Sequence, residues 1–246
     1  METRAWCTVI QHQRCPTSPG TRRPPTRPAA LTPPHRAMRL AKRSSWLLRH
    51  AYEGAPDGFH ISDADRLRVN ASGGVGAAAY GELSASGGSV LLHALGLDES
   101  SVFCDLGSGR GALVMQAALE SRASLCIGVE LSAERHAVAA RALARLQAHQ
   151  PDAIRARLVC ADLRTASLDG VTAVFVANLL FPPPLDAAVS RRLAACTELR
   201  RVATLKPLPV LPGLTFKCRL KLPFTWAERC SVFVYQHTSK TSEAWS

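Results

Sequence analysis

The stretch Val102-Phe-Cys-Asp-Leu-Gly-Ser-Gly-Arg-Gly111 decides the fold of this 246-residue sequence. Its first five residues form an apolar run typical of a short buried β-strand. Glycines follow at positions 107, 109 and 111. Glycine lets the chain turn sharply after a strand and brings backbone N–H groups close to a ligand at the start of a helix. The stretch therefore predicts a strand, a ligand-binding loop and a helix in succession.

Strand and helix patterns alternate outward from this loop. The predicted strands cover residues 102–106, 125–130, 157–162, 171–177 and 201–205, and the predicted helices cover 89–95, 112–121, 133–148 and 185–196. The strands are continuously apolar, which is typical of parallel strands covered on both faces. Segments 215–222 and 231–237 predict a terminal hairpin, because the first alternates strictly and a turn separates the two. We expect an α/β fold, the seven-stranded Rossmann-like sheet of class I methyltransferases, mostly parallel with a C-terminal antiparallel hairpin.

Carboxylates end three of the predicted strands, at Asp105, Glu130 and Asp162. Because the carboxyl ends of parallel strands meet at one edge of a sheet, these side chains are expected to lie around one site. A dinucleotide fingerprint requires G-x-G-x-x-G, whereas this loop reads G-x-G-x-G beside an acid. The pattern suits S-adenosyl-L-methionine as the cofactor, since a carboxylate attracts its ammonium and sulfonium groups.

Each residue of this group has an expected task. Glu130 is placed to accept hydrogen bonds from both ribose hydroxyls, and Asp162 to accept one from the adenine amino group. The cofactor-binding residues expected on the strand ends and the loop are Asp105, Gly107, Ser108, Gly109, Glu130 and Asp162.

The positive charge lies in the first fifty residues. The chain has 30 Lys and Arg against 19 Asp and Glu, a net charge of +11, and residues 1–50 hold ten of the basic residues, one acid and seven of the sixteen prolines. Prolines at that density break helices and strands, and the segment has no periodic apolar face. We expect 1–43 to be a disordered basic tail, 44–79 a short helical or looped lead-in, and 80–246 the methyltransferase domain.

The tail allows three interpretations. An Arg-rich, acid-poor start matches an organellar transit peptide. It equally matches an arm that binds nucleic acid by releasing counterions from phosphates. The third interpretation is a solvated tail without a specific task. No apolar core of a secretory signal is present, so secretion is not expected.

The cysteines indicate a reducing compartment. Eight are present, with no CxxC pair and no His at metal-ligand spacing, so neither a metal site nor a disulfide framework is expected. Cys104, Cys126 and Cys160 lie in apolar runs, where we expect buried free thiols. The longest apolar stretch, 171–181, is far shorter than the ~20 residues that cross a bilayer, so no membrane partner is expected.

Five short motifs carry a family resemblance. In chain order they are Tyr80-Gly-Glu82, Val102-Phe-Cys-Asp-Leu-Gly-Ser-Gly109, Val174-Phe-Val-Ala-Asn-Leu-Leu-Phe181, Leu205-Lys-Pro207 and Tyr235-Gln-His-Thr238. With them, residues 78–238 resemble the catalytic domain of the disruptor-of-telomeric-silencing methyltransferases. These non-SET enzymes methylate a lysine of the nucleosome's histone core. The glycine loop alone fits any class I methyltransferase, and the other motifs narrow the resemblance.

The resemblance implies roles for particular residues. Tyr80 and Glu82 would lie on a loop that closes over the cofactor. Asn178 would stand at the mouth of the lysine channel, as both a catalytic and a cofactor-binding residue, and Tyr235 would line the channel's far wall as the second catalytic residue. Leu163 occupies a cofactor-binding position where an aromatic often stacks on the adenine.

The resemblance also implies an activity and partners. The expected reaction is S-adenosyl-L-methionine-dependent methylation of a lysine of histone three in the nucleosome, in the nucleus, with DNA contact through the basic tail. One alternative is a protein-lysine methyltransferase of the mitochondrion or plastid, whose tail is a cleaved transit peptide. The other is a catalytically degenerate chromatin-binding module, which Ala177 favours because an asparagine is usual there in the family.

Overall fold

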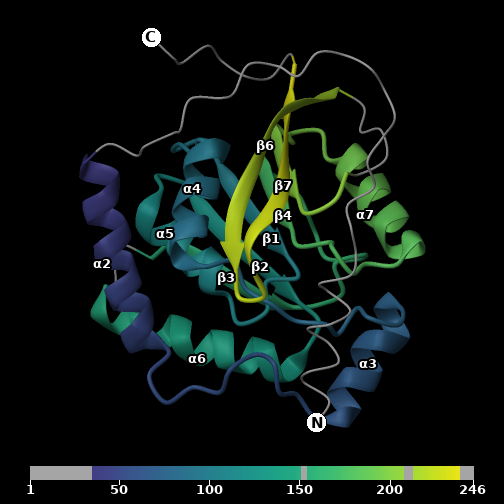
Figure 1. The fold of residues 1–246 in the computed structure, drawn as a ribbon, viewed down its shortest axis with the longest axis horizontal. Helices are drawn as coiled ribbons and strands as arrows, with labels where there is room; N and C mark the ends of the chain where they lie inside the picture. The colour runs from purple at the N-terminus through teal and green to yellow at the C-terminus, as the bar shows by residue number, and fades with distance from the viewer. Residues whose placement is uncertain (1–34, 151–153, 208–212, 239–246) are drawn as a thin grey trace.

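The computed structural model describes residues 35–150, 154–207 and 213–238, with side chains from Leu40 onward. They form one seven-stranded sheet in the order β3-β2-β1-β4-β5-β7-β6 (Figure 1). The strands are β1 (Val102–Leu106), β2 (Leu125–Glu130), β3 (Ala156–Cys160), β4 (Ala173–Val176), β5 (Arg201–Thr204), β6 (Leu214–Phe224) and β7 (Ala227–His237). The helices are α2 (His35–Ala51), α3 (Asp63–Gly73), α4 (Ala85–Leu95), α5 (Ala112–Glu120), α6 (Ala133–His149) and α7 (Pro183–Ala195).

The predicted sheet is confirmed. Strands β1 to β5 pair in parallel, and β7 runs antiparallel to both β5 and β6. The β1–β2 register places Asp105 opposite Gly128 and Leu106 opposite Val129. This register brings the ends of β1 and β2, with Asp105 and Glu130, to the same edge of the sheet.

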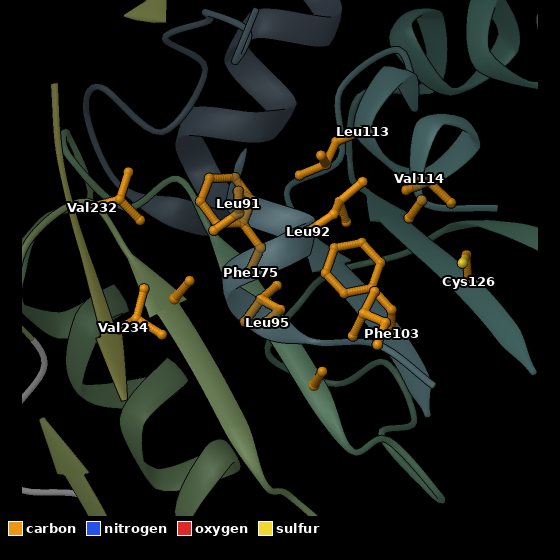
Figure 2. Close-up of a cluster of buried hydrophobic side chains, with 14 of the residues drawn as sticks. Leu91, Leu92, Leu95, Phe103, Leu113, Val114, Cys126, Phe175, Val232 and Val234 are labelled. Carbon is orange, nitrogen blue, oxygen red and sulfur yellow. The ribbon is translucent and has the colours of Figure 1, made fainter. Parts of the chain in front are cut away.

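Helices cover both faces of the sheet because the strands are apolar on both sides. Leu91 and Leu95 of α4 pack with Phe103, Phe175 and the β7 valines on one face (Figure 2). Helices α5 and α6 cover the same face. On the opposite face, α7 packs Val189 and Leu193 against β1, β2, β4 and β5.

Helix α2 changes the predicted boundary of the tail. The helix begins at His35, so residues 35–43 are helical and not disordered as expected. Its second half buries Leu47, Leu48 and Ala51 against α5 and α6, where they meet Leu143. Because the preceding segment is rich in proline, the sequence pattern did not indicate the apolar face of this helix. Residues 1–34 of the predicted tail lie outside the described residues.

The thiols differ from the prediction at one position. Cys104 and Cys126 are buried as expected, whereas Cys160 is exposed because β3 is an edge strand. In the described part of the chain, no helix is both long and apolar enough to span a membrane.

Candidate functional site

A cavity opens at the carboxyl ends of β1, β2 and β4. Asp105, Glu130 and Asp162 all line it, together with Gly107, Ser108 and Gly109 of the glycine loop. The segment 77–83 and the second half of α3 form its other side. The structure thus brings together residues that the sequence places on three separate strand ends.

Asp105 is the most buried carboxylate of the cavity. Its side chain is only 4% exposed, and no hydrogen-bond partner among the described residues reaches its Oδ1 atom. Burial, with the nearby Glu130 carboxylate, raises the pKa of Asp105 to about 8. A buried acceptor without a partner is costly, so this oxygen is suited to a cationic donor in the cavity.

Glu130 is held by two backbone donors. The N–H of Gly109 donates to its Oε2 at 2.8 Å, and the N–H of Ser132 donates to its Oε1 at 2.7 Å. Each carboxylate oxygen retains a lone pair for a further donor. The carboxylate is therefore fixed in position and can still accept hydrogen bonds from a ligand's hydroxyl groups.

The Tyr80 ring packs against the glycine loop at Gly109, where only glycine fits. Gly109 has φ +55°, and a Cβ there would come within 2.6 Å of that ring. Tyr80 also packs under the guanidinium of Arg135, which lies 4.4 Å above the ring centroid. The aromatic ring thus closes the loop side of the cavity.

Arg110, inside the glycine loop, joins the loop to the segment that carries Tyr80. Its Nη2 donates to Glu82 Oε2 at 2.8 Å and its Nε donates to Glu82 Oε1 at 3.0 Å. Tyr80 donates its hydroxyl hydrogen to the same carboxylate. Burial and Glu82 raise the pKa of Tyr80 far above its usual value, so the phenol remains a donor. Glu82, Arg110 and Tyr80 form what we call the roof of the cavity.

The roof is also anchored by Tyr52, which directly follows α2. The Tyr52 hydroxyl donates to the backbone carbonyl of Arg110 at 2.5 Å, and the Arg110 guanidinium lies 4.9 Å above the Tyr52 ring. Neither Arg110 nor Tyr52 is among the site residues predicted from the sequence. A charged side chain between two loop glycines was a signal for Arg110, whereas the sequence gives no signal for Tyr52.

Arg135 was also missed. It is only 4% exposed and donates to the carbonyl oxygens of Gly58 and Ala78, both at 2.9 Å, so it ties two loops to the start of α6. Arg135 lies in α6, whose several arginines are typical of a solvent-exposed helix. The sequence therefore gives no indication that this arginine is buried.

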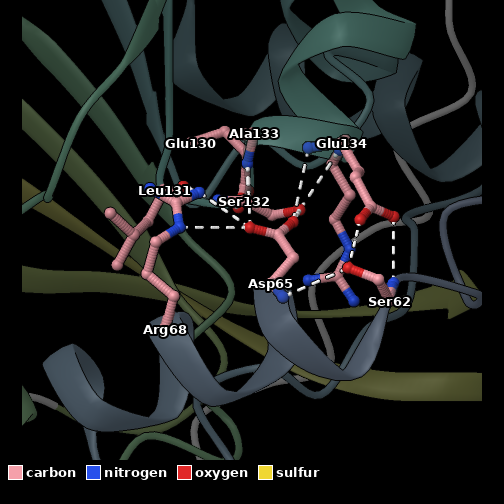
Figure 3. A network of polar contacts seen from close by, with 9 residues as sticks. Ser62, Asp65, Arg68, Glu130, Leu131, Ser132, Ala133 and Glu134 are labelled. Carbon is pink, nitrogen blue, oxygen red and sulfur yellow. Dashed lines mark hydrogen bonds and ion pairs between the residues drawn. The ribbon is translucent and has the colours of Figure 1, made fainter.

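Helix α3 is docked over the cavity by polar contacts with the start of α6 (Figure 3). Ser132, the N-cap of α6, donates its hydroxyl hydrogen to Asp65, and Asp65 also accepts from Arg68 at 2.8 Å. Ser62, the N-cap of α3, donates its N–H to Glu134 at 3.0 Å. The two helix starts therefore cap one another, which holds Ser72 of α3 at the cavity.

Asp162 lies in the cavity wall but is already engaged. Arg164 donates to both its carboxylate oxygens and Ser72 donates to one of them. Although partial burial alone would raise it, these hydrogen bonds lower the pKa of Asp162 to about 2. Asp162 is thus ionised, and Leu163 beside it lines the cavity as an aliphatic wall.

The other end of the cavity is apolar. Its lining includes Leu83, Phe175, Ala177, Leu179, Phe224 and Trp226. Trp226 packs so closely on Gly81 that a Cβ there would lie 1.9 Å from the indole ring. These six residues belong to one apolar cluster, and Phe175 lies opposite Asp105 in the sheet. We call this part of the lining the apolar end of the cavity, and the part with Asp105, Glu130 and Asp162 its acidic end.

The structure corrects the predicted position of Asn178 and Tyr235. Asn178 is fully buried and does not line the cavity. Its Oδ1 accepts from the backbone N–H groups of Leu205 at 2.9 Å and Lys206 at 3.1 Å, and its Nδ2 donates to Asp186 at 3.1 Å. The amide points to the end of β5, because there it accepts hydrogen bonds from two backbone N–H groups that would otherwise lose this acceptor. Tyr235 packs beside the α7 face of the sheet instead of lining the cavity.

Comparison with known proteins identifies the family. A family model described as histone methylation protein DOT1 matches residues 60–215, more than half of the chain. The chain belongs to the DOT1 family. No curated protein sequence matches it.

A solved structure shares the fold of this DOT1 domain. A "putative RNA methyltransferase" from Pyrococcus horikoshii is 16% identical, with a TM-score of 0.53 over 81% of this chain and 98% of the other. An RNA methyltransferase from Salinibacter ruber, in complex with S-adenosyl-L-homocysteine, is 18% identical, with a TM-score of 0.48 over 64% of this chain and 94% of the other.

S-adenosyl-L-methionine is the cofactor of the DOT1 family, and this chain is an S-adenosyl-L-methionine-dependent methyltransferase of class I. The cavity fits the cofactor, because Asp105 offers an unpaired acceptor to a cation and Glu130 offers fixed acceptors to hydroxyl groups. Within the described ranges, no cluster of three or more His, Cys, Asp or Glu side chains could hold a metal ion.

Proposed function

We propose that this DOT1-family protein methylates a lysine side chain of histone three in the core of the nucleosome. The observation that carries the proposal is the apolar end of the cavity, which adjoins the acidic end. The family description, histone methylation, supports the same substrate class.

The apolar end suits an amine that must react uncharged. The bound cofactor supplies a methyl group on a sulfonium, which only a free amine lone pair can attack. The aromatic rings of Phe175, Phe224 and Trp226 line the apolar end of the cavity. An apolar environment lowers the pKa of a lysine that enters it. The lysine then loses its proton to water on entry, and the walls aim the nitrogen and exclude solvent.

The acidic end orients the cofactor in this proposal. Asp105 would hold the ammonium group, Glu130 the ribose hydroxyls, and Asp162 the adenine amino group. Gly107, Ser108 and Gly109 would supply the backbone surface beside it. Asn178 would act indirectly, by fixing the segment from Ala177 to Phe181 that forms part of the wall.

Nucleosomes are the proposed partner, in the nucleus, and the basic tail is proposed to contact their DNA. The charge of residues 1–50, ten basic groups against one acid, favours phosphate contact. If cells remove this tail, the nuclear proposal fails and the organellar alternative gains.

Transfer of a labelled methyl group tests the proposal. The full chain would be incubated with labelled cofactor and, separately, nucleosomes, free histones and total RNA, with Glu130→Ala as the inactive control. We expect label on histone three in nucleosomes. Label on RNA alone would contradict the proposal, and cofactor binding without transfer to any of the three would favour the degenerate module.

A further inference from the structure

The terminal hairpin carries an aromatic and basic face outside the cavity. Strand pairing places Phe216 opposite Tyr235 and Arg219 opposite Phe233. The rings of Phe216 and Tyr235 meet edge to face, with centroids 6.1 Å apart. Because residues two apart on a strand share a face, Phe233 and Tyr235 lie on the same side of the hairpin.

Lys221 extends this face toward the turn. It pairs with Ser231, and its Nζ donates to the Ser231 hydroxyl at 2.7 Å. We call the surface formed by Phe216, Arg219, Lys221, Phe233 and Tyr235 the hairpin face. The opposite side of β6 faces the core. There, Leu220 and Leu222 pack in the buried cluster that also contains Leu91 and Leu95 of α4.

The hairpin face is open to solvent along the edge of the sheet. β6 is the last strand of the sheet, and the hairpin is drawn in yellow in Figure 1. The side chain of Phe216 is 57% exposed, Arg219 and Lys221 are exposed, and Phe233 and Tyr235 are half-buried. An exposed phenylalanine ring in water is unfavourable, so this surface favours a partner.

The charge of the face selects an anionic partner. In the part of the chain that the structure describes, no carboxylate forms an ion pair with Arg219 or Lys221. Both cations are therefore available to phosphates. Aromatic rings interleaved with free cations are how proteins bind single strands, where bases stack on rings and phosphates pair with the cations.

We propose that the hairpin face binds single-stranded nucleic acid, with bases stacked on Phe216 and the backbone held by Arg219 and Lys221. A duplex hides its base faces and is the weaker ligand. The proposal is independent of the lysine substrate, because no residue of the hairpin face lines the cavity.

Fluorescence anisotropy with the full chain tests the proposal, using labelled oligouridine and a DNA duplex of the same length. Phe216→Ala is expected to weaken oligouridine binding at least fivefold, with little change for the duplex. The double variant Arg219→Gln, Lys221→Gln is expected to lower the slope of log affinity against log salt for oligouridine by about 1.4.

Controls match each change elsewhere on the surface. Leu67→Ala removes an apolar side chain that is 69% exposed, and Arg49→Gln with Arg141→Gln removes two exposed charges. The charge control matters because any basic surface, including the tail for which we propose DNA contact, attracts either probe by charge alone. The proposal is overturned if the hairpin variants behave like their controls, or if polyglutamate displaces oligouridine as well as unlabelled oligouridine does.

Discussion

At the scale of single residues, Asp105 shows how burial sets what a carboxylate can do. With a pKa raised to about 8, it is largely protonated at neutral pH in the free protein. A cationic ligand favours its ionised form, so binding should release a proton.

We therefore expect affinity for S-adenosyl-L-methionine to rise between pH 6 and pH 8, and Asp105→Asn to lose about ten- to hundredfold in affinity together with this dependence. Calorimetry in buffers of different ionisation enthalpy measures both the affinity and the released proton. Glu99→Gln, which removes an exposed carboxylate, is the control. An unchanged pH dependence in Asp105→Asn would contradict the assignment.

The raised pKa of Asp105 predicts the opposite pH dependence for the stability of the fold. Between about pH 4 and pH 8 the native protein keeps a proton on Asp105 that the unfolded chain has released. The free energy of unfolding should therefore fall as pH rises through this window. Urea unfolding without cofactor should show a smaller fall in Asp105→Asn.

Asn178 is a positioning residue in this structure. Asn178→Ala leaves the backbone N–H groups of Leu205 and Lys206 without their buried acceptor, so the free energy of unfolding should fall by about 2–4 kcal/mol. Urea denaturation checks this, with Asn70→Ala on α3 as a comparison. The half-buried Asn70 side chain accepts from one backbone N–H, that of Ala78 at 3.0 Å, so its loss should cost less. Unchanged stability with slowed methyl transfer would instead support a catalytic role for Asn178.

The sequence could predict Asp105 and Glu130 but not the direction of Asn178. Acids at the ends of parallel strands face one edge whatever the rest of the chain does. An amide just after β4 can face either the cavity or β5, and only the path of Leu205 and Lys206 decides between the two.

At the scale of elements, Arg110 connects the glycine loop to the segment from Tyr80 to Glu82. Arg110→Ala leaves Glu82, whose side chain is 21% exposed, without its ion-pair partner. The cost should be below the ~3–5 kcal/mol of a fully buried pair, and the loosened roof should weaken cofactor binding and speed cofactor release.

Stopped-flow release of the cofactor measures this effect. Arg110→Lys keeps the charge without the paired hydrogen bonds, so its release rate should fall between those of wild type and Arg110→Ala. Arg122→Ala breaks an ion pair whose side chains are 73% and 64% exposed, and it should behave as wild type. Equal release rates in all four proteins would exclude a role for the roof.

The strands could be predicted from the sequence, whereas the position of α3 against the start of α6 could not. Each buried strand shows its environment locally, as a continuous apolar run. Helix α3 is held by Ser62 and Asp65, whose partners lie 72 and 67 residues away. Polar contacts at such separations leave no periodic signal in the sequence.

At the scale of the whole molecule, α2 belongs to the folded domain although it precedes the family match at residue 60. It buries Leu47, Leu48 and Ala51, and Tyr52 after it holds Arg110. A chain that starts at residue 60 should thus lose about 4 kcal/mol or more of unfolding free energy, at ~1.5–3 kcal/mol for each buried leucine.

Thermal unfolding of two truncated chains checks the prediction. A chain that starts at residue 35 should unfold near the wild-type temperature and bind cofactor as tightly. A chain that starts at residue 60 should unfold at a much lower temperature and bind poorly. Equal stability of the two chains would show that α2 is dispensable.

Calorimetric titration of S-adenosyl-L-methionine into the full chain and into Glu130→Ala tests directly whether the carboxylates of the cavity bind the cofactor. We expect one binding site per chain, with heat that is lost or strongly reduced in the variant because the carboxylate fixed by Gly109 and Ser132 is gone. No heat in the wild type, or equal affinity in both proteins, would contradict it.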